Sequence, residues 1–431
     1  MKSIWQQSVK VKRFERLTQN KTTDILIIGG GLAGILCGYK LAQSGADCII
    51  IEANRICDKT TANTTGKITA QHGLIYTDIF EKYGADAAKE YLEANLSALK
   101  DYRNICQNID CDFEIKDNYV YSTDRKKLER EIEVLKEIGY NAKLKTNLPI
   151  KTANSGAVCF EKQAQFNPLK FVSSICNDLE IYERTIARKI EKNIVYTDTC
   201  KIYASKIIVA THFPIINKYG GYFLKMYQHR SYLLALENAP DIEGMYVGCK
   251  KTDMTFRNYN GMLLVGGGGH RTGKHGGGYD ELMQFVRIHY PEAKIKTRFA
   301  AQDCITLDGI AYIGEYSKLT HNLFVATGFN KWGMSLSMVS ATLLCDLVQN
   351  RKNKYSKLFS PSRSLMHPQL LANAFESVYG ILTPTKPRCT HLGCALKWNL
   401  YEHSWDCPCH GSRFDENGEI LNSPANKKGK F

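Results

Sequence analysis

The sequence has no long hydrophobic run. Across its 431 residues, no apolar stretch approaches the roughly 18 to 20 residues that a helix needs to span a bilayer. The first residues, MKSIWQQSVKVKRF, lack the apolar core of a signal peptide, and we expect residues 1–20 to form a polar, basic lead-in. The sequence therefore predicts a cytoplasmic protein without a membrane span.

Dense blocks of one charge are also missing. The formal net charge is +14, but the lysines and arginines are spread through the chain, which favours a solvated basic surface over a nucleic-acid site. Internal repeats, nucleophile elbows, Walker loops and acid pairs of the glycosidase type are absent as well. With 44% hydrophobic and 23% charged residues, the chain has an ordinary globular composition, and its length favours two to three domains.

Cysteine, in contrast, is abundant, with fifteen residues. Four of them lie together near the C-terminus. The others, including Cys304, are scattered among core-like segments, where we expect reduced structural thiols.

The clearest local motif begins with the apolar run Ile25–Ile28, which predicts a buried parallel strand. The run leads into three glycines spaced G-x-G-x-x-G, Gly29, Gly31 and Gly34, and then into a helix. Glycine here permits a tight turn, close approach of a pyrophosphate, and close packing of the helix on the strand. A second strand ends at Glu52, placed to accept a hydrogen bond from a ribose hydroxyl. The motif therefore predicts a dinucleotide site.

The rest of the chain alternates helical and strand patterns. Periodicity predicts helices at residues 85–106, 124–138 and 334–348, and strands at 118–122, 194–197, 201–203 and 206–210. Asn167 is the expected cap of a further helix. Residues 230–269 show the short alternation of an antiparallel sheet. The Thr-rich segment 53–76 is too polar for a core, and we expect it to line a cofactor.

These pieces together resemble the D-amino-acid-oxidase-like (DAO) FAD-dependent oxidoreductases. The matching segments span most of residues 21–350: Gly29 to Gly34 with Glu52, Thr60 to Gly73, Ala210 to Pro214, Thr306 to Gly314 and Ala326 to Gly333. The resemblance implies an α/β fold, a Rossmann-like FAD-binding domain of the DAO type with an inserted antiparallel β-sheet substrate domain. It implies that FAD lies along Gly29, Gly31, Gly34, Glu52, Thr65, Thr211, Gly328 and Gly333.

Candidates for substrate contact sit at strand ends or loops of the predicted substrate sheet, where an arginine could grip a carboxylate through a bidentate pair. They are Arg230, Tyr232, Arg257, Tyr259, His270 and Arg271, although a residue of this kind is more often simply a surface residue. His72 either contacts the flavin, with or without a covalent bond, or is a hydrogen-bonded loop histidine. Trp332 is expected to pack near the flavin.

A second motif occupies residues 389–414, CTHLGCALKWNLYEHSWDCPCHGSRF, which read C-x-H, fifteen residues, then C-x2-H. It resembles a Rieske 2Fe-2S domain. The resemblance implies that two thiolates, Cys389 and Cys407, bind one iron and two neutral imidazoles, His391 and His410, bind the other. A tetrahedral zinc site is the alternative for cysteine and histidine at short spacing.

The Rieske resemblance implies two further features. Cys394 and Cys409 match cysteines that form a disulfide between the two loops in one branch of that family. Pro424 resembles the proline loop that covers the cluster, although Ser423 replaces the usual preceding glycine. Residues 387–431 hold only the cluster loops and their hairpins, so we expect the cluster to depend on packing against the flavin domain.

The expected domain order is discontinuous. FAD-binding segments at 21–105, 161–225 and 301–350 alternate with substrate-domain segments at 106–160 and 226–300; a linker at 351–386 and a small all-β Rieske module at 387–431 follow.

The resemblances together imply an FAD-dependent enzyme that oxidises the C–N bond of an amine or amino acid. Electrons would pass through the 2Fe-2S cluster to a one-electron carrier, such as an acidic ferredoxin or flavodoxin. Two alternatives remain open: a flavin oxidase with a redox-sensing Rieske tail, and an electron-transfer protein without an organic substrate.

Overall fold

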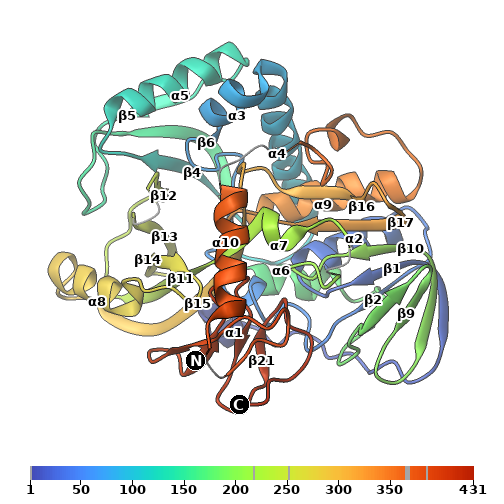
Figure 1. Cartoon of the computed structure of the whole chain (residues 1–431). Helices are drawn as coiled ribbons and strands as arrows, with labels where there is room; N and C mark the ends of the chain where they lie inside the picture. Colours follow the sequence, from blue (N-terminus) through green and yellow to red (C-terminus); the bar gives the residue numbers. More distant parts are fainter. Residues whose placement is uncertain (1, 217–218, 251–252, 365–368, 385–386) are drawn as a thin grey trace.

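The computed structural model describes residues 2–216, 219–250, 253–364, 369–384 and 387–431. Within these ranges the chain forms three sheets with helices around them (Figure 1). No helix in the described ranges is long and apolar enough to cross a membrane. Figure 1 shows the first sheet on the right, the second on the left, and the C-terminal segment below both.

The first sheet is built on the predicted Rossmann-like unit. Its order is β16-β17-β10-β1-β2-β7, with β17, β10, β1, β2 and β7 parallel and the β8–β9 hairpin attached to β10. Ile25 and Ile27 pack into one core and Leu26 and Ile28 into another, as expected for a parallel strand covered on both faces. The strands are β1 Lys21–Ile28, β2 Cys48–Ile51, β7 Ile181–Tyr182, β8 Lys189–Glu191, β9 Ile194–Tyr196, β10 Lys201–Val209, β16 Tyr312–Ser317 and β17 Thr320–Thr327.

The second sheet is the predicted inserted sheet. Its order is β15-β11-β14-β13-β12-β4-β6-β3, with β5 on β6. Among the described strands of this sheet, β12 and β4 form the one parallel pair. The strands are β3 Lys67–Ile68, β4 Glu114–Tyr121, β5 Lys143–Lys145, β6 Ala157–Gln165, β11 Met226–Glu237, β12 Met245–Gly248, β13 Thr255–Tyr259, β14 Met262–Arg271 and β15 Lys294–Thr306.

The C-terminal module is a small antiparallel sheet, β18 Lys397–Asn399, β19 Ser404–Asp406, β20 Arg413–Phe414 and β21 Ile420–Asn422. Helix α10 Gln369–Leu382 precedes it and contains much of the segment predicted as a linker. Residues 365–368 and 385–386 of that segment lie outside the described residues. Gly380 of α10 lies directly on the module, because an added Cβ there would be 2.4 Å from Cys409 Sγ.

The remaining helices flank the two large sheets. They are α1 Ile4–Ser8, α2 Leu32–Gln43, α3 Ile75–Tyr83, α4 Ala85–Cys106, α5 Arg125–Glu137, α6 Pro168–Ile175, α7 Tyr222–Lys225, α8 Gly278–His289 and α9 Gly333–Val348, with short 3-10 helices η1 Thr61–Asn63 and η2 Lys354–Ser356. The side chain of Asn167 caps α6, as the sequence predicted.

Three local predictions were wrong. The lead-in at residues 1–20 contains α1, whose Trp5 is fully buried and donates from Nε1 to Thr64 O at 2.8 Å. Half of the Thr-rich segment is buried, including all of residues 66–72, because its polar groups find partners: Thr69 Oγ1 donates to Gln163 Oε1, for example. The strands predicted at 201–203 and 206–210 are one strand, β10.

Two glycines of the motif have different roles in the fold. At Gly34 an added Cβ would be 1.9 Å from the Gly29 carbonyl oxygen, so the glycine allows α2 to lie directly on the turn. At Gly31, the N-cap residue of α2, the nearest atom to an added Cβ would be Thr61 Oγ1, at 3.8 Å. Gly34 therefore serves packing, whereas Gly31 leaves one side of the turn open.

Substitution of these two positions should separate fold from cofactor binding. We expect Gly34→Ala to lower the stability of the flavin-free protein by about 1–3 kcal/mol, because the methyl group overpacks the helix–strand contact. Gly31→Ala should leave that stability nearly unchanged and reduce flavin content instead. Thermal unfolding of the flavin-free variants and flavin absorbance of the purified variants measure the two effects. Equal melting temperatures of the flavin-free Gly34→Ala and Gly31→Ala variants would contradict the assignment of Gly34 to packing.

Candidate flavin and iron-sulfur site

The glycine turn and Glu52 form one end of the predicted flavin site. Glu52 accepts hydrogen bonds from the amides of Gly30, at 2.8 Å, and Asn54, at 2.9 Å. Burial raises the pKa of Glu52, although these two hydrogen bonds oppose the shift. The open side of Gly31 and the amides at the start of α2 suit a pyrophosphate, so the residues present fit FAD.

A large cavity of about 1170 Å³ continues from the Thr-rich segment to the second sheet. Its wall includes Thr65, Lys67, His72, Asp303 and Trp332, and strands β11, β13, β14 and β15 also contribute residues. We call it the large cavity below. It has room for a flavin ring together with a small substrate.

His72 is held firmly in the wall of this cavity. Its Nδ1 lies 2.7 Å from the Tyr91 hydroxyl and its Nε2 lies 2.8 Å from Ser335 Oγ. The ring stacks on Trp332 with 4.8 Å between centroids, and burial lowers the pKa of His72 to about 3. His72 is thus a neutral, hydrogen-bonded histidine. Its contact with the flavin stays a prediction.

The other predicted flavin residues lie around the first sheet. Thr211 follows β10 and donates to Phe213 O at 2.8 Å. Gly328 follows β17 with φ +73° and packs on Thr306, while Gly333 begins α9. Their role as flavin contacts stays a prediction, as it does for Gly29, Gly31, Gly34, Glu52 and Thr65.

The two predicted cluster loops have matching backbone geometry. In the first, Gly393 N donates to Cys389 O at 2.9 Å and Cys389 N donates to Cys394 O at 2.9 Å. In the second, Gly411 N donates to Cys407 O at 2.9 Å and Cys407 N donates to Ser412 O at 2.8 Å. Gly393 and Gly411 both have positive φ, +76° and +80°. The loops thus present Cys389 and Cys407 from equivalent positions.

The two predicted histidine ligands lie next to each other. The rings of His391 and His410 have centroids 5.0 Å apart and are nearly perpendicular, at 83°. Burial lowers the pKa of His391 to about 4 and that of His410 to about 3, so both imidazoles are neutral, as metal ligation requires. Two buried thiols and two neutral imidazoles in adjoining loops fit a Rieske cluster.

Two further cysteines lie beside this set. The Sγ atoms of Cys394, Cys407 and Cys409 are all within 4.8 Å of one another, a grouping that would also suit a metal ion. Cys394 and Cys409 are both thiols in this structure, so the predicted disulfide is not formed here and stays a prediction.

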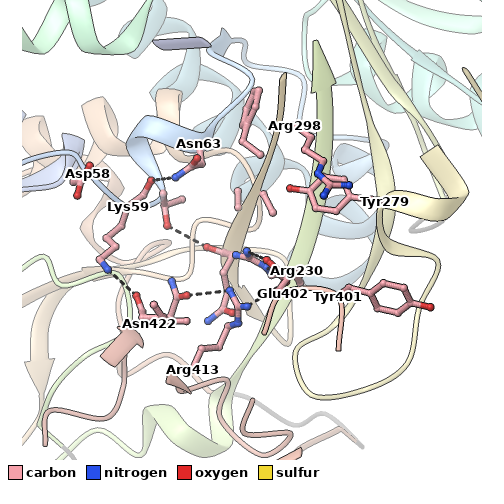
Figure 2. A pocket seen from close by; sticks show the side chains of 16 residues that line it. Asp58, Lys59, Asn63, Arg230, Tyr279, Arg298, Tyr401, Glu402, Arg413 and Asn422 are labelled. Atoms are coloured by element: carbon pink, nitrogen blue, oxygen red, sulfur yellow. Dashed lines mark hydrogen bonds and ion pairs between the residues drawn. The ribbon is translucent and has the colours of Figure 1, made fainter. Parts of the chain in front are cut away.

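A buried charge network attaches the module to the second sheet (Figure 2). Arg230 on β11 donates to both carboxylate oxygens of Glu402, from Nε at 2.9 Å and from Nη2, and Arg413 approaches Glu402 Oε2 at 3.2 Å. Arg413 also donates to Asp406 at 2.8 Å. Burial alone would raise the pKa of Glu402, but the two arginines outweigh it and hold the pKa at about 2.

Two glutamines of the second sheet bind the second cluster loop directly. Gln228 Nε2 on β11 donates to His410 O at 2.8 Å and to Ser423 O at 2.8 Å. Gln302 Nε2 on β15 donates to Gly411 O at 2.8 Å and to the side chain of Gln228. The cluster loop therefore rests on the second sheet, and the dependence of the cluster on packing against the flavin domain stays a prediction.

The six predicted substrate contacts fall into two groups. Arg230, Tyr232, His270 and Arg271 lie toward the C-terminal module: Tyr232 donates to Glu402 at 3.2 Å, and Arg271 donates to Cys409 O at 3.2 Å. Arg257 and Tyr259 lie behind the Thr-rich segment, where Arg257 donates to Thr65 O at 2.6 Å and Tyr259 to Asp112 at 2.6 Å. Tyr232 is the member of the six that lines the large cavity.

The sequence analysis missed several residues of the site. Glu402, Gln228 and Gln302 carry no local motif, and their partners are more than 70 residues away in the chain. Lys67, which is buried, and Asp303, which is half-buried, are charged residues in the wall of the large cavity. Lys67 is the one lysine, arginine or acidic residue between positions 60 and 76, and this was the available signal.

The charge network predicts a pH-dependent attachment of the module. Because its folded-state pKa is depressed, Glu402 contributes stability above its ordinary pKa of 4.5, and this contribution is lost as the pH falls toward 2. Glu402→Gln removes the carboxylate partner of buried Arg230, while Arg413 keeps Asp406, and should cost about 3–5 kcal/mol at pH 7. Fluorescence of Trp398 and Trp405 during urea and acid unfolding measures both effects. Glu416→Gln, at an exposed position, is the control; if both variants match the wild type, the network does not stabilise the module.

Comparison with known proteins agrees with this geometry. The DAO family, "FAD dependent oxidoreductase", matches residues 24–347, and the "Rieske [2Fe-2S] domain" matches residues 374–430. The chain is 34% identical to the "Putative Rieske 2Fe-2S iron-sulfur protein YhfW" of Bacillus subtilis (strain 168), over 99% of this chain and 96% of that protein.

Two solved structures share the fold. Glycine oxidase from Geobacillus kaustophilus has a TM-score of 0.66 at 19% identity, covering 80% of this chain and 100% of that chain. L-Proline dehydrogenase from P. horikoshii has a TM-score of 0.66 at 16% identity, covering 80% and 98%. The chain belongs to the DAO family of FAD-dependent oxidoreductases, binds FAD, and carries a Rieske domain that binds a 2Fe-2S cluster.

Proposed function

We propose that this oxidoreductase oxidises the C–N bond of an amine or amino acid and passes the electrons through its Rieske cluster to a one-electron acceptor. The flavin supplies a two-electron acceptor and the cluster a one-electron carrier. The names of the two solved relatives, a glycine oxidase and a proline dehydrogenase, support an amino-acid or amine substrate.

One observation carries the proposal: a single strand separates the two cofactor sites. On β15, Ala301 and Asp303 line the large cavity, while the amide of Gln302 between them donates to the cluster-loop carbonyl Gly411 O. Successive residues of a strand point to opposite faces. The cavity and the cluster loop are therefore neighbours across β15, which supports direct electron exchange.

Aromatic contacts support the same proposal from the histidine side of the cluster loops. The Phe213 ring lies 6.3 Å from that of His391, and the Phe223 ring lies 5.8 Å from that of His410, centroid to centroid. Phe213 lies two residues after Thr211, a predicted flavin contact. These contacts support a position of the predicted histidine ligands beside the segment that follows β10.

Asp303 is our candidate for proton transfer in the large cavity. Burial raises the pKa of Asp303 to about 6, although Lys331 and Arg230 oppose the shift. A carboxylate with such a pKa suits a general base near neutral pH, and a protonated amine must lose a proton before its C–N bond is oxidised.

The wider assignments are part of the same proposal. The predicted domain boundaries remain as given by the sequence: 21–105, 161–225 and 301–350 for FAD, 106–160 and 226–300 for substrate, and 387–431 for the Rieske module. The net charge of +14 favours an acidic carrier of the ferredoxin or flavodoxin type. A cytoplasmic location is supported by the many buried cysteines, all thiols in this structure.

Replacement of the cysteine ligands should divide the reaction into two parts. We expect Cys389→Ser and Cys407→Ser to abolish transfer to a one-electron dye while anaerobic bleaching of the flavin by substrate persists, because those thiols lie outside the large cavity. Cys200→Ser, at a half-buried position away from both sites, is the control. Equal loss of both steps would contradict the proposed division. Rapid hydrogen peroxide formation with an intact cluster would instead indicate an oxidase with a sensing tail.

A further inference from the structure

The predicted arginines do not provide a carboxylate site in the large cavity. Arg230 is occupied by Glu402, and Arg271 donates to Asn373 and to Cys409 O. Arg257 lies behind the wall, where its Nη1 donates to Thr65 O and Gly66 O. A substrate with a carboxylate therefore needs another cation in this cavity.

Lys67 is a buried cation in the wall of the large cavity. Lys67 is only 6% exposed, and its Nζ donates to Tyr246 O at 2.8 Å and to Thr255 Oγ1 at 2.5 Å. The Thr255 hydroxyl itself donates to Tyr246 O at 2.9 Å, so it must accept from Lys67. Two of the three ammonium donors are used in this way, and one is left for a ligand.

The surroundings of Lys67 lack a compensating acid. Burial, followed by the neighbouring Arg257 guanidinium, lowers the pKa of Lys67 well below its ordinary value, and no carboxylate among the described residues offsets the shift. Arg257 is itself 1% exposed, and its Nη2 has no hydrogen-bond partner in the described part of the chain. Glu114 and Asp112 act on the Arg257 guanidinium and hold up its pKa in part, but neither is among the groups that act on Lys67. A buried lysine without an acid of its own, beside a second buried cation, forms a site suited to an anion.

The wall beside Lys67 leaves room for such a ligand. Gly266 and Gly267 of β14 line the cavity without side chains, and Gly266 pairs with Thr255 on one side and Leu233 on the other. Ser231 of β11 also lines the cavity, and its hydroxyl is buried without a partner among the described residues. A ligand over the glycines would thus contact Lys67 at one end and the unused Ser231 hydroxyl at the other. The distance is roughly 10 Å, because β13 and β11 are two strand spacings apart.

We propose that Lys67 binds the carboxylate of the substrate, so that the substrate is an amino acid or an N-substituted amino acid and not a simple amine. This inference rests on the proposed function and narrows it. The carboxylate accepts a hydrogen bond from the free ammonium donor of Lys67 and neutralises the charge of that ammonium group. The rest of the substrate then extends over Gly266 and Gly267 toward Ser231 and Asp303.

The test is a titration of the FAD-loaded protein with benzoate, followed through the absorbance of the bound flavin. Benzyl alcohol, which has the same ring and no charge, is the matched probe. We expect a saturable spectral change with benzoate and a much weaker one with benzyl alcohol. In Lys67→Met the benzoate affinity should fall by about tenfold or more, since a charge-assisted hydrogen bond is lost.

The fold should tolerate this change, because Thr255 Oγ1 continues to donate to Tyr246 O. Lys67→Gln, which keeps a donor for that carbonyl, gives a second measurement if the first variant loses flavin. Lys126→Met removes an exposed lysine from the rim of the same cavity and should bind benzoate like the wild type.

Benzoate binding of equal strength in Lys67→Met and wild type would overturn the inference, as would a wild type that does not bind benzoate. Both outcomes are independent of the proposed reaction, which is read from anaerobic bleaching of the flavin by amines and amino acids. Bleaching by amines without benzoate binding would remove Lys67 as the anchor and leave the oxidation in place. Lys67-dependent benzoate binding without bleaching by any of these compounds would keep Lys67 as an anion-binding residue and contradict the proposed oxidation.

Discussion

The arrangement of the two redox sites depends on one buried carboxylate. Glu402, in the turn between β18 and β19, accepts hydrogen bonds from Arg230 of the second sheet and lies beside Arg413 of its own module. Four strands cannot bury much apolar surface, so a module of this size gains stability mainly through contact with a larger neighbour. The ion pairs are shielded from water, which makes them stronger than surface pairs and makes the loss of one partner costly. The position of the cluster loops relative to the flavin domain follows from this contact.

Strand β15 links the large cavity and the cluster loop because its two faces contact one each. Asp303 and Ala301 face the large cavity, whereas Gln302 holds the cluster loop through Gly411. Gln228 of β11 repeats the contact on His410 O, so the two neighbouring strands bind the same loop. The large cavity and the cluster loop are therefore supported by a single sheet, and a displacement of that sheet would change both.

Local sequence signals were reliable wherever a short segment fixes its own structure. The helix predicted at residues 85–106 is α4 with the same bounds, and Asn167 caps α6, because hydrophobic periodicity and capping are local properties. Such signals failed where distant partners decide burial. Trp5 was expected in a polar lead-in, yet it packs edge-on against Tyr259 at 4.6 Å. The Thr-rich segment was expected outside the core, yet Gln163 and other distant groups satisfy its hydroxyls.

The sequence by itself determined the cofactors, since the glycine spacing and the paired C-x-H and C-x2-H loops are chemical requirements of FAD and of a 2Fe-2S cluster. Tertiary structure alone decided which charged residues face the large cavity. Arg230 and Arg257, predicted at the substrate, are turned to Glu402 and to backbone carbonyls, while Lys67 lies in the cavity wall. The physical reason is that strand alternation fixes only that a side chain faces one side of a sheet or the other. What lies on each side is set by segments hundreds of residues apart, which meet only when the chain has folded.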